Sequence, residues 1–139
     1  MPMALSCRCC RCQQATVASA ADINNRGQVL ANARFGTGLG SFVRPYIWDE
    51  GEITMLGLLP DARGAAAGSM NAQAVVVDAT PPNDRNASLL DQIATVWRHG
   101  LPAELDTLIC ADDRFHSLLQ LVQALAINDR GQIVAWGDG

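Results

Sequence analysis

Two short motifs recur along this chain and alternate with one another, and this repetition constrains the fold more than any other sequence feature. Residues 23–30 read INNRGQVL and residues 127–134 read INDRGQIV, with five of eight positions identical. A weaker copy at residues 70–77 reads MNAQAVVV. In the second motif a Trp, at position 48 and again at 97, is followed three residues later by Gly and eight residues later by Leu. The copies are offset by 47, 57 and 49 residues, which indicates tandem units.

Each unit is predicted to form four short strands. In the first unit, residues 19–23 lead into an Asn-x-x-Gly turn, which tolerates positive φ, and residues 28–31 return antiparallel. Residues 41–48 are β-branched and aromatic, and residues 52–56 follow after another turn. The equivalent segments of the second unit are 65–70, 74–78, 93–97 and 101–105. This pattern predicts an all-β chain of tandem four-stranded antiparallel units, a partial β-propeller.

Two segments interrupt the repeat. Residues 80–90 are predicted to form a long polar loop between the second and third strands of the second unit. Residues 110–125 carry apolar side chains at helical spacing and are predicted to form a short amphipathic helix.

The predicted domain organisation follows from the repeat. We expect a disordered, Cys-rich leader at residues 1–18 and a repeat domain at residues 19–139. Its units cover about residues 19–58, 65–108 and, as a partial unit, 121–139. The third unit ends after its hairpin, and unpaired strand edges favour association. We therefore expect self-association through open strand edges.

The two motifs resemble the repeat of the HAF family of bacterial extracellular repeat proteins. The resemblance is carried by residues 23–30, by Tyr46-Ile47-Trp48 with Gly51 and Leu56-Gly57, and by residues 105–109 through 127–134, and it extends over about residues 19–136. It implies a secreted or cell-surface protein and carries over no catalytic residues. The namesake His-Ala-Phe element is absent, and Ala74 replaces the Gly of the middle hairpin.

Composition narrows the classes of partner. Hydrophobic residues make up 49% of the 139 residues and charged residues 17%, which is typical of a folded chain. The net charge is −4 and the ten positive charges, all Arg, are scattered, so the sequence disfavours nucleic acid. No apolar run reaches the roughly 18–20 residues of a membrane helix. The first twenty residues lack the apolar centre of a signal peptide, so we expect no export signal in this chain.

The densest group of potential ligands is a run of four cysteines, Cys7, Cys9, Cys10 and Cys12. Thiolates bind Zn²⁺ and Cu⁺ well, and a metal or redox protein is therefore one alternative. A Cys-x-Cys-Cys-x-Cys run lacks the second pair of ligands of a zinc site, and we interpret it as part of the leader. Cys110 stands alone and is interpreted as a small apolar residue.

The remaining polar residues are interpreted as solvated or structural. No Ser-His-Asp order, phosphate loop or His-Glu-x-x-His motif is present. The recurring asparagines are expected to stabilise tight turns, with a ligand site as the second interpretation, and the two tryptophans are expected to be buried between units. The solvated polar residues are His99, Asp112, Asp113 and His116. The asparagines are Asn24, Asn71 and Asn128, and the tryptophans are Trp48 and Trp97.

The function favoured by the sequence is a non-catalytic repeat module, interpreted as a fragment of a propeller-like secreted or surface protein and acting as a scaffold or binding module without a cofactor. The ligand stays open. One alternative is a propeller-type hydrolase or lyase, for which the innermost strands offer only Asp22 and Ser69. The other alternative is the metal or redox protein built on the Cys cluster.

Overall fold

The computed structural model describes residues 15–84, 86–114, 116 and 118–139. These residues form ten strands, arranged in antiparallel sheets of four, four and two, and contain no α-helix. The chain is thus all-β and built from tandem antiparallel units, as the repeat predicts. The Cys cluster of the leader lies outside the described residues.

The first unit is a sheet of four strands in chain order. Its strands are β1 (Ala15–Ile23), β2 (Val29–Phe35), β3 (Phe42–Asp49) and β4 (Glu52–Met55). A short 3-10 turn, η2 (Gly38–Gly40), connects β2 to β3.

The second unit repeats this order. Its strands are β5 (Ala66–Met70), β6 (Val76–Thr80), β7 (Ile93–Arg98) and β8 (Leu101–Glu104). The predicted long loop separates β6 from β7 and contains η3 (Leu89–Asp91), and η4 (Leu105–Leu108) follows β8.

The third unit is the hairpin of β9 (Gln120–Ile127) and β10 (Ile133–Asp138). The predicted amphipathic helix at residues 110–125 is therefore wrong. The described residues before position 120 form turns, and the rest of that segment belongs to β9. The apolar side chains fit a helical spacing, but β9 buries Val122 and Ala124 at strand spacing and pairs with β10, a partner that a local pattern cannot reveal.

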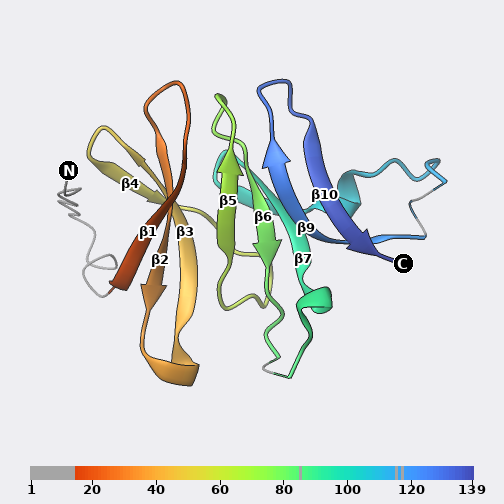
Figure 1. Ribbon diagram of the computed structural model, residues 1–139, viewed down its shortest axis with the longest axis horizontal. Helices are drawn as coiled ribbons and strands as arrows, with labels where there is room; N and C mark the ends of the chain where they lie inside the picture. The colour runs from red at the N-terminus through yellow and green to blue at the C-terminus, as the bar shows by residue number, and fades with distance from the viewer. Residues whose placement is uncertain (1–14, 85, 115, 117) are drawn as a thin grey trace.

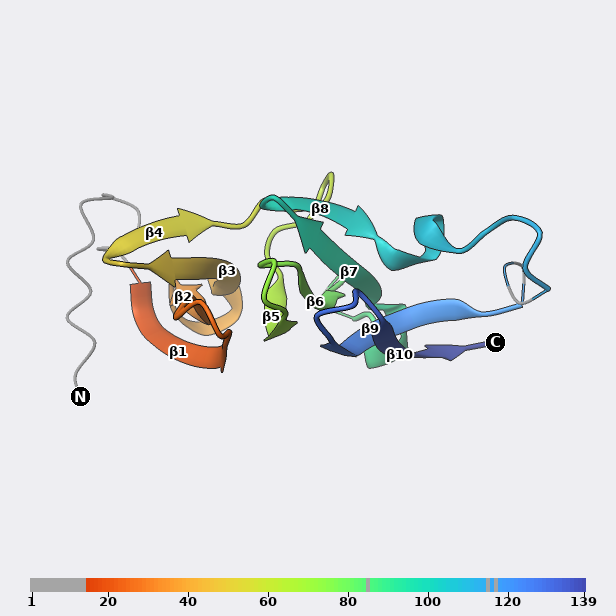
Figure 2. The ribbon, with the colours of Figure 1, turned by 90° about the horizontal axis from the view of Figure 1, so that it is seen from above.

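The three sheets stand side by side along the long axis of the molecule (Figure 1). Seen from above, β4 and β8 lie along one side, whereas β1, β9 and β10 lie along the opposite side (Figure 2). We call the face of a sheet that is turned toward the C-terminal end of this row its forward face. The opposite face of the same sheet is its rear face.

The core lies between these faces. One buried cluster joins the first and second units and includes Leu30, Leu56, Met70 and Trp97. Another joins the second and third units and includes Val77, Val96, Leu105 and Ala124. Burial of apolar surface between neighbouring units is how repeat proteins gain stability, so the units depend on one another.

The hairpin at the start of each unit has the same backbone geometry. The fourth residue of each turn has positive φ: 77° at Gly27, 58° at Ala74 and 80° at Gly131. A bulge interrupts each hairpin at the equivalent place, between Ala20 and Asp22 in the first unit and between Ala67 and Ser69 in the second. In the third unit the equivalent bulge lies at Leu125, between the pairs of Ala126 and Ala124 with β10. The turn predicted from Asn-x-x-Gly is confirmed, including at the copy that has lost its Gly.

Candidate functional site

The recurring asparagines hold the three hairpin turns. Asn24 Oδ1 accepts from the backbone N–H groups of Arg26 and Gln28, each at 3.1 Å. The other two copies repeat the arrangement. Asn71 Oδ1 accepts from the N–H groups of Gln73 and Val75, and Asn128 Oδ1 accepts from those of Arg130 and Gln132. An Asn side chain that accepts backbone N–H groups two residues onward is a well-known turn stabiliser.

The same asparagines also connect one unit to the next. Asn24 Nδ2 donates to the carbonyl oxygen of Asn71 at 3.1 Å, and Asn71 Nδ2 donates to the carbonyl oxygen of Asn128 at 3.1 Å. We call this series the asparagine ladder. Asn24 Nδ2 also donates to Gln28 Oε1 at 2.8 Å within its own turn, and Asn128 Nδ2 makes the equivalent bond to Gln132 Oε1 at 2.8 Å. The sequence indicates the turn but not the ladder, because the ladder depends on how the units are placed.

Asp22 and Ser69, the candidates for inward chemistry, are also used between units. The N–H of Met70 donates to Asp22 Oδ2 at 2.8 Å, and the N–H of Ile127 donates to Ser69 Oγ at 3.3 Å. Asn32 adds a two-way contact, because its side chain donates to the Ala67 carbonyl and accepts from the Ala67 N–H, each at 2.9 Å. These polar groups therefore pair with backbone groups of the following unit.

The two tryptophans differ in burial. Trp97 is 1% exposed, and its Nε1 donates to the Gly57 carbonyl at 2.8 Å. Trp48 is only half-buried. The prediction of burial between units is thus confirmed for Trp97, against which the first unit lies. It holds only in part for Trp48, which packs against Ala31 and Tyr46 of its own unit and has no earlier unit against it among the described residues.

The remaining sequence candidates do not converge. His99, with φ 52°, is exposed in the turn that Glu50, with φ 49°, occupies in the first unit, as predicted from the repeat. Asp112, Asp113 and His116 are exposed, and Cys110 is an exposed free thiol and no buried apolar residue. Within the described residues, no three His, Cys, Asp or Glu side chains gather as metal ligands.

Asp78 is a titratable group that sequence reasoning missed. It lies on β6, and burial raises the pKa of its carboxyl above the usual value of 3.8, while a hydrogen bond from Gln123 acts in the opposite direction. Gln123 Nε2 donates to Asp78 Oδ1 at 2.8 Å, and Trp136 Nε1 donates to Gln123 Oε1 at 3.2 Å. A Cβ at Gly68 would lie 2.9 Å from Asp78 Oδ2, so the glycine leaves room for the carboxylate.

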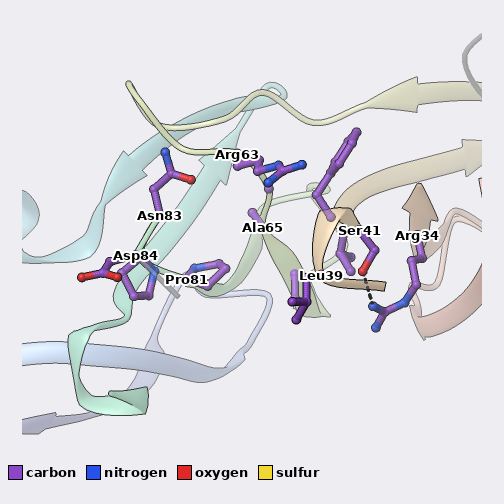
Figure 3. A pocket seen from close by; sticks show the side chains of 13 residues that line it. Arg34, Leu39, Ser41, Arg63, Ala65, Pro81, Asn83 and Asp84 are labelled. Carbon is purple, nitrogen blue, oxygen red and sulfur yellow. Dashed lines mark hydrogen bonds between the residues drawn. The ribbon is translucent and has the colours of Figure 1, made fainter. Parts of the chain in front are cut away.

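A hollow of about 300 Å³ lies between the first two units, next to the β2–β3 connection (Figure 3). Leu39, Ser41 and Arg34 lie on one side of it, and Asn83 and Asp84 on the other. Arg34 Nη1 donates to Ser41 Oγ at 3.2 Å.

A second guanidinium, that of Arg63, lines the same hollow. Arg63 Nη2 donates to the Gly40 carbonyl at 2.7 Å, and the guanidinium lies 5.9 Å from the centre of the Phe42 ring. Guanidinium groups and a hydroxyl are suitable donors to a carboxylate or a phosphate. The sequence does not indicate this hollow, because its walls come from both units.

Comparisons of the chain with protein-family models, with curated proteins and with solved structures find no match. No helix of the described residues is long and apolar enough to cross a membrane.

Proposed function

We propose that the chain is a non-catalytic repeat module of a secreted or surface protein, and that it acts as a scaffold or binding module. The observation that carries this proposal is the asparagine ladder. The asparagines that recur with the repeat bind the backbone of their own turn and, in Asn24 and Asn71, of the next unit. Recurrence of these residues is therefore explained by unit stacking, and function in such folds belongs to the surfaces that the stack displays. The secreted or surface location rests on the resemblance to the HAF repeat.

The hydrolase or lyase alternative provides the test of this proposal. Its best residue is Asp78, whose carboxyl has a raised pKa, a property that general acids often share. We expect purified protein to show no turnover of ester, phosphoester, glycoside or polysaccharide substrates above that of a D78N variant. Turnover that purifies with the protein and disappears in D78N would establish an enzyme.

The hollow beside Arg34 and Arg63 favours a more specific version of the binding role, in which it takes a small carboxylate or phosphate. Calorimetric titration with citrate and with inorganic phosphate tests this idea. We expect R63Q to abolish the heat of binding and R98Q to leave it unchanged, because Arg98 lies at the end of β7 and outside the hollow. Absence of binding to the unaltered protein would remove this version and leave the scaffold role in place.

We also propose that copies of the chain associate with one another. In the described residues β10 pairs only with β9, whereas its counterparts β2 and β6 each pair with a strand on both sides. Strand edges without a pairing strand and uncovered apolar faces both favour association. The net charge of −4 makes nucleic acid an unsuitable partner.

A further inference from the structure

The forward faces of the three units differ in how well they are covered. Leu30, Val77 and Val134 occupy the same position of their hairpins, on the strand that follows the turn. Leu30 and Val77 are 0% exposed and belong to the clusters shared with the next unit, whereas Val134 is 61% exposed. Trp136 follows on the same face of β10 and is 38% exposed. The third unit thus presents an uncovered copy of a surface that is buried twice elsewhere in the molecule.

The rear face of the first unit shows the complementary difference. Ile23 and Met70 are equivalent residues immediately before the turn. Met70 is 5% exposed because it packs against the first unit, whereas Ile23 is 64% exposed. Trp48 and Trp97 form a second equivalent pair, and again the residue of the first unit is the more exposed.

The polar contacts of this interface also have unfilled counterparts at the two ends. At the forward end, Asn128 Nδ2 donates to Gln132 within its own turn, as Asn24 Nδ2 does to Gln28, but among the described residues it donates to no carbonyl of another unit. At the rear end, the Asn24 carbonyl accepts the N–H of Gly27 and, within residues 15–84 and the other described segments, no side-chain amide of another unit, whereas the Asn71 carbonyl accepts both the N–H of Ala74 and the amide of Asn24. A donor at one end and an acceptor at the other are thus in the positions that the ladder uses internally.

We propose that the forward face of the third unit docks on the rear face of the first unit in a second copy of this chain, repeating the internal interface. Val134 and Trp136 pack against Ile23 and Trp48 of the second copy, and Asn128 Nδ2 donates to the Asn24 carbonyl of that copy. The second copy is the occupant because the chain itself carries both complementary surfaces, and each continues an interface already present in the molecule. This inference rests on the proposed self-association and names its surfaces.

The proposed contact is head-to-tail, because the forward face of one copy binds the rear face of the other copy. Such a heterologous contact produces either a closed ring or an open filament.

Light scattering coupled to gel filtration over a concentration series tests the proposal with three variants. V134E places a carboxylate on the forward face, and I23E places one on the rear face. Burial of an unpaired carboxylate should weaken association about tenfold or more in each variant. The control is L101E, because Leu101 is 71% exposed on β8 and Glu52 occupies its position in the first unit.

A mixture of V134E and I23E gives the sharpest readout. V134E keeps an intact rear face and I23E an intact forward face, so we expect the mixture to form a one-to-one heterodimer that does not grow further. Pairing of two β10 edges would give no such complementation.

Three outcomes would overturn the docking proposal. Oligomers unaffected by V134E and I23E would leave self-association standing but exclude these faces. A mixture that fails to form the heterodimer would exclude the head-to-tail arrangement. An unaltered protein that stays monomeric at every concentration would remove self-association as well, while the scaffold role would remain.

Discussion

The side-chain amide of Asn71 lies 3.1 Å from the carbonyl oxygen of Asn128 and donates to it, 57 residues along the chain. The oxygen of the same side chain accepts from the N–H groups of Gln73 and Val75. One residue therefore fixes its own turn and joins two units. A short polar side chain with both a donor and an acceptor is needed for this double role, and Asn provides both.

The ladder bond can be separated from the turn bonds by substitution of Asn with Asp, which keeps an acceptor oxygen and loses the donor. We expect N71D to lower the free energy of unfolding by about 1–2 kcal/mol, because the Asn128 carbonyl loses the bond from Asn71 and faces a carboxylate, while it keeps the N–H of Gly131. In dilute, monomeric protein N128D should cost less than about 0.5 kcal/mol, since among the described residues its amide donates to Gln132 of its own exposed turn and to no other unit. Urea denaturation measures both. Equal losses would show that the ladder adds no stability.

The two tryptophans should differ in the same kind of measurement. Trp97→Ala removes a fully buried ring between units and should cost about 3–5 kcal/mol. Trp48→Ala should cost clearly less, because the ring of Trp48 is half-buried and the solvent already covers part of it. If Trp48→Ala proves as costly as Trp97→Ala, the rear face of the first unit must be covered in solution.

Much of the fold follows from the repeat because strand order and turn chemistry are local. The Asn-x-x-Gly spacing predicts positive φ at Gly27 and Gly131, and the repeat extends this to Ala74. The helix expected at residues 110–125 was wrong because the local spacing of apolar residues does not distinguish a helix from a paired strand. The repeat itself predicts a first strand before Ile127, and β9 is that strand.

The contacts between units could not be predicted, because they depend on how one sheet is placed against the next. The bond between Gln123 and Asp78 joins residues 45 positions apart on two different sheets. The hollow likewise combines Arg34 of the first unit with residues 81–84 of the second unit, which follow β6. The sequence shows each of these residues as an ordinary polar position.

Ala74 carries a strained backbone that a glycine would relieve. Its φ of 58° matches the turns that hold Gly27 and Gly131, and L-residues other than glycine pay roughly 1 kcal/mol there. We expect Ala74→Gly to raise the free energy of unfolding by about 0.5–1 kcal/mol and Gly131→Ala to lower it by a similar amount. Thermal melts of the two variants measure the opposite shifts. A destabilising Ala74→Gly would mean that the methyl group contributes more by packing than it costs in strain.

The carboxyl of Asp78 should make stability depend on pH in an unusual direction. Burial raises its pKa in the folded chain above 3.8, so the folded state binds this proton more tightly than the unfolded state does. Its contribution is therefore fully present below the unfolded pKa of about 3.9 and is lost as the pH rises through the folded-state pKa.

Asp78→Asn tests this expectation, because the amide keeps the oxygen that accepts from Gln123 Nε2 and is neutral at every pH. We expect the variant to be more stable than the unaltered protein at pH 7, and its advantage to disappear below about pH 3.9 as the aspartic acid becomes protonated. Urea denaturation midpoints at pH 7, 5 and 3 measure the difference, with Asp112→Asn as the control because Asp112 is exposed. A variant that is less stable at pH 7 would show that the charged form of Asp78, held by Gln123, is the one that the fold favours.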